Sequence, residues 1–102
     1  MLVNCIRYTI DPAKRDAFAA YAKGWTEIIG ADPEAMLIGY FLPTRIAGPT
    51  NTAYALIGFA SLAAYAAYRD RIAADPRGAK LFADADREGF VLNEERSFLT
   101  KA

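Results

Sequence analysis

The chain has 102 residues, the length of one domain with a modest hydrophobic core, and we expect a single domain over residues 1–102. Hydrophobic residues make up 54% of the chain and charged residues 24%, as in an ordinary globular protein. The formal net charge is zero and the pI is near 6.2, so no electrostatic footprint for nucleic acid or an anionic membrane is present. We therefore expect partners that are small or apolar, and neither nucleic acid nor membrane.

The residue types present limit the chemistry. The chain contains no histidine, which is the usual acid or base near neutral pH and the commonest metal ligand. Its carboxylates are scattered, it has no glycine-rich phosphate loop, and no serine or cysteine nucleophile stands near an evident base. We expect no metal and no cofactor, so that any reaction would proceed without them.

The cysteine content and the N-terminal stretch bear on location. Cys5 is the single cysteine, it lies in an apolar run, and we interpret it as an inert thiol that fits a reducing compartment. The stretch MLVNCIRYTI lacks the features of a secretory signal, and no apolar run reaches the roughly 20 residues that span a bilayer. We expect a cytoplasmic protein.

Hydrophobic periodicity divides the chain into strands and helices. Alternation of apolar and polar residues indicates strands, and apolar residues at three- and four-residue steps indicate helices. In chain order, the predicted elements are a strand at Leu2–Ile10, a helix from Pro12 to Gly30, strands at Met36–Leu42 and Thr52–Ala60 joined by a loop at Pro43–Asn51, helices at Leu62–Ala74 and Pro76–Arg87, and a strand at Phe90–Leu99.

Local signals support the helix boundaries. Asp-Pro pairs at 11–12 and 75–76 place a side-chain acceptor before a proline, which suits the first helical position, and Ser61 is a further N-cap. Gly30 and Gly89 are predicted stops. The apolar stripe of the first helix is predicted to be Phe18, Tyr21, Trp25, Ile28 and Ile29, while Leu62, Tyr65, Arg69 and Ile72 recur at helical steps in the second.

This order of elements, βαββαβ, predicts an α+β ferredoxin-like fold with a four-stranded antiparallel sheet and helices on one face. The opposite face must then meet water or be covered. We expect it to carry an apolar set too large for a monomer to expose, so that two sheets face each other in a homodimer and enclose an apolar space. The expected members are Ile6, Tyr8, Ala55, Ile57, Phe59, Phe90, Leu92 and Phe98.

That space is a candidate chamber for a small hydrophobic ligand. Arg96 would anchor a ligand carboxylate, while Glu94 would hold the guanidinium in place, unless the two form only a solvated ion pair. A one-residue slip in the last strand would replace this pair with Asn93, Glu95 and Ser97. The predicted ligand-binding residues are Asn4, Tyr8, Ala55, Ile57, Phe59, Glu94 and Arg96, with Ile6 on the same face.

Short stretches along nearly the whole chain match a known pattern. They are Tyr8-Thr9-Ile10-Asp11-Pro12, Gly39-Tyr40-Phe41, Gly48-Pro49-Thr50-Asn51, Ser61-Leu62-Ala63, Ala74-Asp75-Pro76 and Glu94-Glu95-Arg96. On these pieces the chain resembles the NIPSNAP domain family, and the resemblance implies a ferredoxin-like protomer that pairs into a dimeric α/β barrel. The sequence departs from the resemblance at Ala55 and Ile57, where a histidine and a tryptophan are expected, and near Tyr65, where a basic residue is replaced.

Two functional interpretations follow. The first is a dimer that binds or transforms a small hydrophobic molecule without metal or cofactor, with Tyr8, Tyr40 and Tyr54 as possible phenolic donors or simply as core or interface aromatics. The alternative is a non-catalytic scaffold or stress-related binding module. An RNA-recognition fold is disfavoured because the charge is neutral and the third strand lacks a basic and aromatic cluster.

Overall fold

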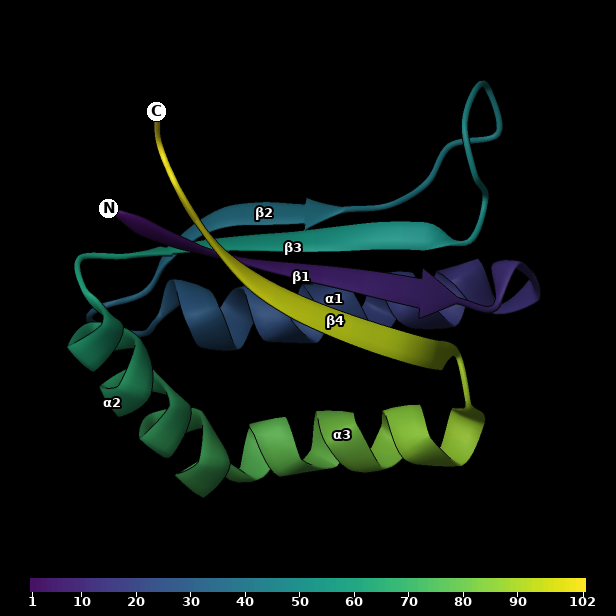
Figure 1. Cartoon of the computed structure of the whole chain (residues 1–102). Coiled ribbons are helices and arrows are strands. Elements are labelled where there is room, and N and C mark those ends of the chain that lie inside the picture. The colour runs from purple at the N-terminus through teal and green to yellow at the C-terminus, as the bar shows by residue number, and fades with distance from the viewer.

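In the computed structural model, which describes residues 1–102, four strands form one antiparallel sheet and the helices pack on a single face of it (Figure 1). The strand order is β2-β3-β1-β4, so the first and third strands are central. This confirms the predicted ferredoxin-like α+β fold. The elements are β1 (Leu2–Ile10), the 3₁₀ turn η1 (Pro12–Lys14), α1 (Arg15–Gly30), β2 (Met36–Phe41), β3 (Thr52–Phe59), α2 (Leu62–Ala74), α3 (Pro76–Glu88) and β4 (Val91–Thr100).

The 3₁₀ turn η1 and the helices α2 and α3 begin at the predicted capping residues. The side chains of Asp11, Ser61 and Asp75 each accept a backbone N–H two or three residues further on, at 2.9 to 3.1 Å, which satisfies donors that a helix start leaves free. Gly89 follows α3 in the left-handed conformation, with φ at 66°, where a residue without a Cβ is favoured. The boundaries of α2 and α3 lie within one residue of those predicted, whereas Asp11 caps the 3₁₀ turn η1 and α1 itself begins at Arg15, three residues after the predicted start.

Strand register shows which side chains share a face. Ile6 on β1 stands opposite Ala55 on β3 and opposite Arg96 on β4, so these three lie on one side of the sheet. That side packs against the helices and supplies part of the hydrophobic core. The buried apolar residues of β1 and β3 are Ile6, Tyr8, Ile10, Ala53, Ala55, Ile57 and Phe59, and those of α1 are Phe18, Tyr21, Ala22, Trp25, Ile28 and Ile29.

The predicted orientation of the sheet is wrong. The face with Ile6, Tyr8, Ile57 and Phe59 was expected to point away from the helices, but these side chains are at most 5% exposed because the helices cover them. Which residues of β1 and β3 share this face was predicted correctly, since alternation along a strand fixes that. The side of the sheet on which the helices pack was not, because both faces carry apolar residues.

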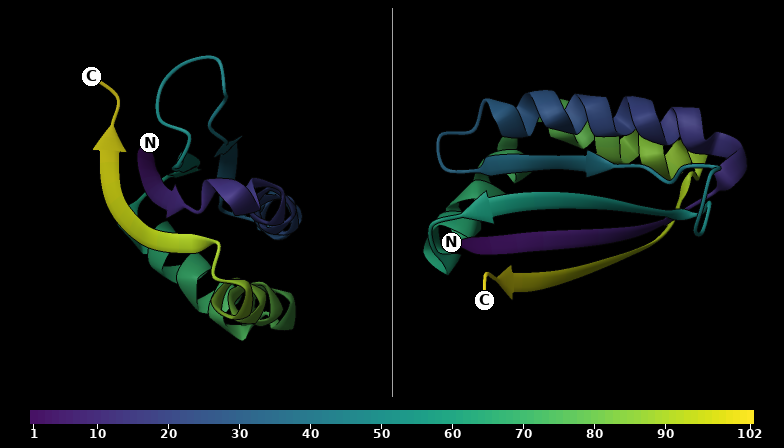
Figure 2. Two further views of the ribbon diagram at one scale, coloured as in Figure 1. Left: turned by 90° about the vertical axis from the view of Figure 1, so that its right-hand side faces the viewer. Right: turned by 90° about the horizontal axis from the view of Figure 1, so that it is seen from above.

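The face without helices is also apolar over part of its area. Met36, Phe41, Tyr54 and Leu99 lie on it according to strand register, and each is 39 to 50% exposed. In the view from above, no helix passes in front of the strands (Figure 2, right). An apolar surface of this kind is unusual for a monomer when it is contiguous.

Two details of the predicted faces need correction. Leu92 is 62% exposed, because β4 has a bulge between the positions that pair with Thr9 and Ile10. Phe90 is buried, but it lies before the first residue of β4. Beyond the bulge, Glu94 and Arg96 keep the predicted side, so the one-residue slip does not occur.

The buried stripe of α2 also differs from the predicted one. Ala64, Tyr68 and Ile72 are buried, whereas Leu62 is 62% exposed at the start of the helix. The buried positions are four residues apart, which keeps them on one side of a helix. None of the helices has the length and apolar character that crossing a membrane requires.

Candidate functional site

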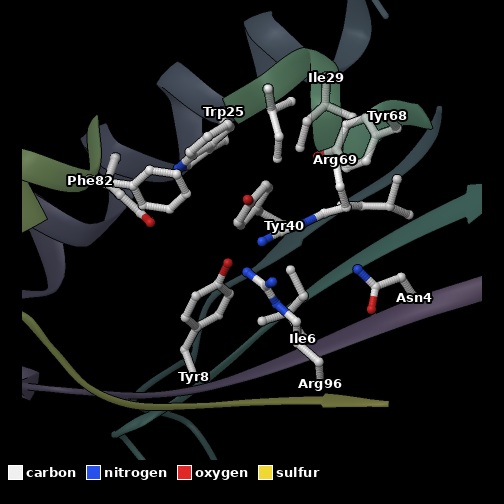
Figure 3. Close-up of a pocket in the computed structure, with 13 residues that line it drawn as sticks. Asn4, Ile6, Tyr8, Trp25, Ile29, Tyr40, Tyr68, Arg69, Phe82 and Arg96 are labelled. Atoms are coloured by element: carbon white, nitrogen blue, oxygen red, sulfur yellow. The ribbon is translucent and has the colours of Figure 1, made fainter. Parts of the chain in front are cut away.

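A cavity lies between the covered face of the sheet and the helices. The free space inside it is about 20 Å³, which is room for roughly one water molecule. Asn4 and Ile6 of β1 form part of one wall, and Trp25 of α1, Tyr68 of α2 and Phe82 of α3 form part of the other (Figure 3). Most of the lining is apolar or aromatic, with a few polar groups, as is typical of small-molecule sites.

The structure brings most of the predicted ligand-binding residues together in this cavity. Asn4, Tyr8, Ile57 and Arg96 all line it, as does Ile6. Of the others, Ala55 and Phe59 are fully buried on the same face without reaching the free space, and Glu94 contacts Arg96. The predicted set therefore shares one location, but that location is inside the protomer and not between two sheets. Ligand binding by these residues stays a prediction.

Seven lining residues were predicted neither as ligand-binding residues nor as phenolic donors: Tyr21, Trp25, Ile29, Tyr68, Arg69, Ile72 and Phe82. Trp25 and Phe82 pack against each other, with ring centroids 4.9 Å apart, and Trp25 was predicted only as part of the apolar stripe of the first helix. Arg69 extends from α2 toward the middle of the cavity (Figure 3). The sequence did contain a signal for Arg69, because this basic residue recurs at helical steps with the apolar residues of α2.

Arg96 is a charged group held in place at the wall of the cavity. Its Nη2 donates to Oε1 of Glu94 at 2.6 Å, and both side chains are about 30% exposed, at 31% and 30%. Burial disfavours the charged form of Arg96, but the Glu94 carboxylate outweighs this and leaves the pKa of Arg96 above its ordinary value. The guanidinium is therefore permanently charged and can donate to a bound acceptor.

Tyr8 and Tyr40 place two phenols beside this guanidinium. Their rings stack at 6.3 Å with an interplanar angle of 27°. Burial is the main cause that raises the pKa of Tyr8 and the pKa of Tyr40 above the ordinary tyrosine value. Both hydroxyl groups are neutral near pH 7, so they act as hydrogen-bond donors or acceptors and not as bases.

Asn4 is the one buried polar residue whose side chain lacks a partner. It is 2% exposed, and its Oδ1 accepts no hydrogen bond. Buried polar groups in native proteins are nearly always paired, and an exception calls for an explanation such as a missing water or ligand. Asn4 forms part of the wall of the cavity.

The available chemistry is that of hydrogen-bond donors, positive charge and aromatic surface. No group of three or more cysteine, aspartate or glutamate side chains is close enough together to hold a metal ion. The two arginines that line the cavity are groups of the kind that favour an oxygen acceptor or an anion.

Comparison with known structures shows proteins of the same fold. Protein Atu4242 from Agrobacterium tumefaciens is 21% identical with a TM-score of 0.79, and the match covers 100% of this chain and 94% of that one. A NIPSNAP domain protein from Burkholderia xenovorans, itself uncharacterised, is 27% identical with a TM-score of 0.77 over 100% and 95% of the two chains. A protein called an antibiotic biosynthesis monooxygenase is 13% identical with a TM-score of 0.74 over 100% and 99%. At this identity, the last match shows the fold alone.

Comparison at the level of sequence agrees with the structural matches. No curated protein matches this chain. The NIPSNAP family model matches residues 3–102, which is nearly the whole sequence and includes every strand and helix that builds the cavity except the first residue of β1. The chain therefore belongs to the NIPSNAP family.

Proposed function

We propose that the protein binds a small, mainly apolar molecule in the cavity between its sheet and its helices. The observation that carries this proposal is the lining itself, which combines aromatic and aliphatic walls with a few convergent polar groups from β1, β4 and α2. Such a combination lets apolar contacts supply affinity while the polar groups orient the ligand. Asn4 supports the proposal, because its amide nitrogen points toward the cavity and can donate to an acceptor on the ligand (Figure 3).

Transformation of the ligand would rest on the same groups. A carbonyl oxygen that binds beside Arg96 and the hydroxyl of Tyr8 would gain hydrogen bonds and positive charge, both of which favour electron density moving onto that oxygen. We propose this polarisation as the chemistry the cavity can offer without a metal or cofactor. The alternative, a non-catalytic scaffold, would need no ligand in the cavity.

We further propose that the protein is a homodimer that pairs through the face of the sheet without helices. Support comes from Met36, Phe41, Tyr54 and Leu99, whose side chains lie on that face and stay 39 to 50% exposed. A second copy would cover the same patch on both protomers about a two-fold axis. The ligand cavity then belongs to each protomer, on the other side of its sheet.

A matched pair of substitutions tests ligand binding in the cavity. Ile6→Phe enlarges a side chain on the cavity wall, and Ile46→Phe makes the same change at a loop residue that is 94% exposed. We expect single-ring aromatic compounds to raise the melting temperature of the native chain and of Ile46→Phe, and to have little effect on Ile6→Phe. Circular dichroism would show that both variants are folded, since overpacking costs about 1–3 kcal/mol.

Two results would count against the proposal. If the compounds stabilise all three proteins equally, they bind outside the cavity. If a broad set of aromatic compounds stabilises none of them, the scaffold interpretation is favoured.

A further inference from the structure

We propose that the ligand of this cavity is a small aromatic carboxylate, held by Arg69 and Arg96. This inference rests on the proposed function and names the class of ligand. Arg69 comes from α2 and Arg96 from β4, and both guanidinium groups reach toward the middle of the cavity from different walls (Figure 3). Planar guanidinium groups match the two oxygens of a carboxylate, and two of them can hold one carboxylate between opposite walls.

The balance of charge inside the cavity favours an anion. The charge of Arg96 is compensated by the Glu94 carboxylate at 2.6 Å. Arg69 is half-buried, and no side chain or backbone group of the protein accepts a hydrogen bond from it or pairs with it. A partly buried guanidinium without a partner has lost water and gained nothing in return, so an anionic ligand would relieve that cost.

Asn4 gives independent support for a polar ligand group near Arg96. It stands opposite Phe98 on β4, two residues from Arg96, and its side chain is on the same face. Diagonal neighbours of this kind are about 7–8 Å apart, within reach of one small ligand. The Asn4 amide nitrogen points toward the cavity and can donate to a carboxylate oxygen without any turn of the amide (Figure 3).

The remaining walls present aromatic surface. Trp25 and Phe82 pack at 4.9 Å with an interplanar angle of 54°, and Tyr8 and Tyr40 stack on the other side of the cavity. Aromatic rings bind other rings by offset-stacked or edge-to-face contacts. The arginine side chains occupy the middle of the cavity, and its free space is about 20 Å³, so a ligand enters only if these side chains move aside (Figure 3). A ligand with one ring requires less movement than a larger one.

Binding of benzoate, with benzyl alcohol as the uncharged control, tests the inference. We expect titration calorimetry to show benzoate binding the native protein at least roughly tenfold more tightly than benzyl alcohol, because charge-assisted hydrogen bonds form only with benzoate. Arg69→Gln should remove most of this advantage. It is the decisive variant, since Arg69 has no partner in the chain and its loss leaves no other group unpaired. Arg96→Gln should weaken benzoate as well.

Arg45→Gln is the matched control, because Arg45 is exposed in the loop before β3 and its loss changes the net charge equally. We expect it to leave benzoate binding unchanged. Equal binding of benzoate and benzyl alcohol, or full benzoate affinity in Arg69→Gln, overturns the inference while the proposed function stands. If neither compound nor any other single-ring aromatic binds the native protein, the proposed function fails with it.

Discussion

Arg71 and Asp32 form a two-fold hydrogen-bonded ion pair that joins α2 to the turn between α1 and β2. The Arg71 Nε donates to Oδ1 at 2.7 Å and its Nη2 donates to Oδ2 at 2.9 Å. The Asp32 side chain is only 6% exposed, and its Oδ2 also accepts the backbone N–H groups of Glu34 and Ala35. One carboxylate thus fixes both the turn and the position of α2, the helix that carries Arg69 and Tyr68 into the cavity.

Asp32→Asn should therefore destabilise the protein. The amide keeps the shape of the carboxylate but loses the charge and at least one acceptor, and hydrogen bonds to charged groups are worth about 1.5–3 kcal/mol each. We expect the free energy of unfolding to fall by about 1–3 kcal/mol in urea titrations. Asp70→Asn, at an exposed residue of α2, is the control and should change it little. Equal losses in the two variants would contradict a special role for Asp32.

The ion pair between Arg71 and Asp32 should make the free energy of unfolding depend on pH. The hydrogen bonds from Arg71 hold the pKa of Asp32 below its ordinary value in the folded state, despite its burial. In the unfolded chain this carboxyl titrates at about 3.9, so the folded state binds the proton more weakly. The stabilisation is fully present above the unfolded pKa and is lost as the pH falls through the lower, folded pKa.

The difference in unfolding free energy between the native chain and Asp32→Asn should therefore be constant from about pH 7 to about pH 5 and shrink below about pH 4. Urea midpoints measured across this range give the difference directly. Subtraction of the variant removes the effects of other carboxylates. A difference that persists unchanged into strong acid would show that the charge of Asp32 does not stabilise the fold.

Asn4→Leu should stabilise the ligand-free protein while it weakens ligand binding. The buried Oδ1 of Asn4 has no partner, and an apolar side chain of similar size removes its desolvation cost, worth roughly 1 kcal/mol or more. Thermal unfolding should show a higher melting temperature, and benzoate should bind less tightly. Asn93→Leu, at an exposed position on the other face of β4, serves as the control. A lower melting temperature in Asn4→Leu would mean that a bound water or ligand already pairs with the amide.

Two aspartate substitutions on β3 distinguish the faces of the sheet. Tyr54→Asp places a charge on the face without helices and should give a folded monomer if that face forms the dimer. Phe59→Asp places a charge in the core, where the side chain is 0% exposed, and should unfold the protein, since even truncation of a buried Phe costs about 3–5 kcal/mol.

Sedimentation equilibrium and circular dichroism together separate these results. A native chain that is monomeric at micromolar concentration would refute the dimer. A folded and dimeric Phe59→Asp variant would contradict the observed packing of the helices on that face.

Removal of divalent metals should leave the protein unchanged. No cluster of three potential ligands is present, so EDTA should alter neither the melting temperature nor ligand binding. The measurement is a thermal unfolding curve of the untagged protein with and without chelator. A fall in melting temperature on chelation would contradict the prediction.

The sequence by itself determined the elements and the grouping of side chains along each strand. Helix starts at Asp11, Ser61 and Asp75 depend on short-range hydrogen bonds between a side chain and the next backbone N–H groups, so they can be predicted from local sequence. Alternation along β1 likewise placed Asn4 and Tyr8 on one face, because successive side chains of a strand point in opposite directions.

Departures from the regular pattern of a strand or helix could not be predicted from the sequence. The bulge that exposes Leu92 depends on how β4 meets β1, since an extra residue in one strand has meaning only against the partner strand. The choice of Ala64 and Tyr68 over Leu62 as buried residues of α2 depends on the angle at which that helix reaches the sheet. Both are long-range properties.

Only the tertiary structure decided which face of the sheet the helices cover, and thus where the cavity lies. Polar residues such as Asn4 and Arg96 on one face, and apolar ones such as Leu56 and Leu99 on the other, made the two faces similar in composition. Hydrophobic burial depends on the area removed from water and has no direction of its own, so two similar faces give no local signal for the choice. The choice came from the packing of α1, α2 and α3 together, which also brought Arg69 opposite Arg96.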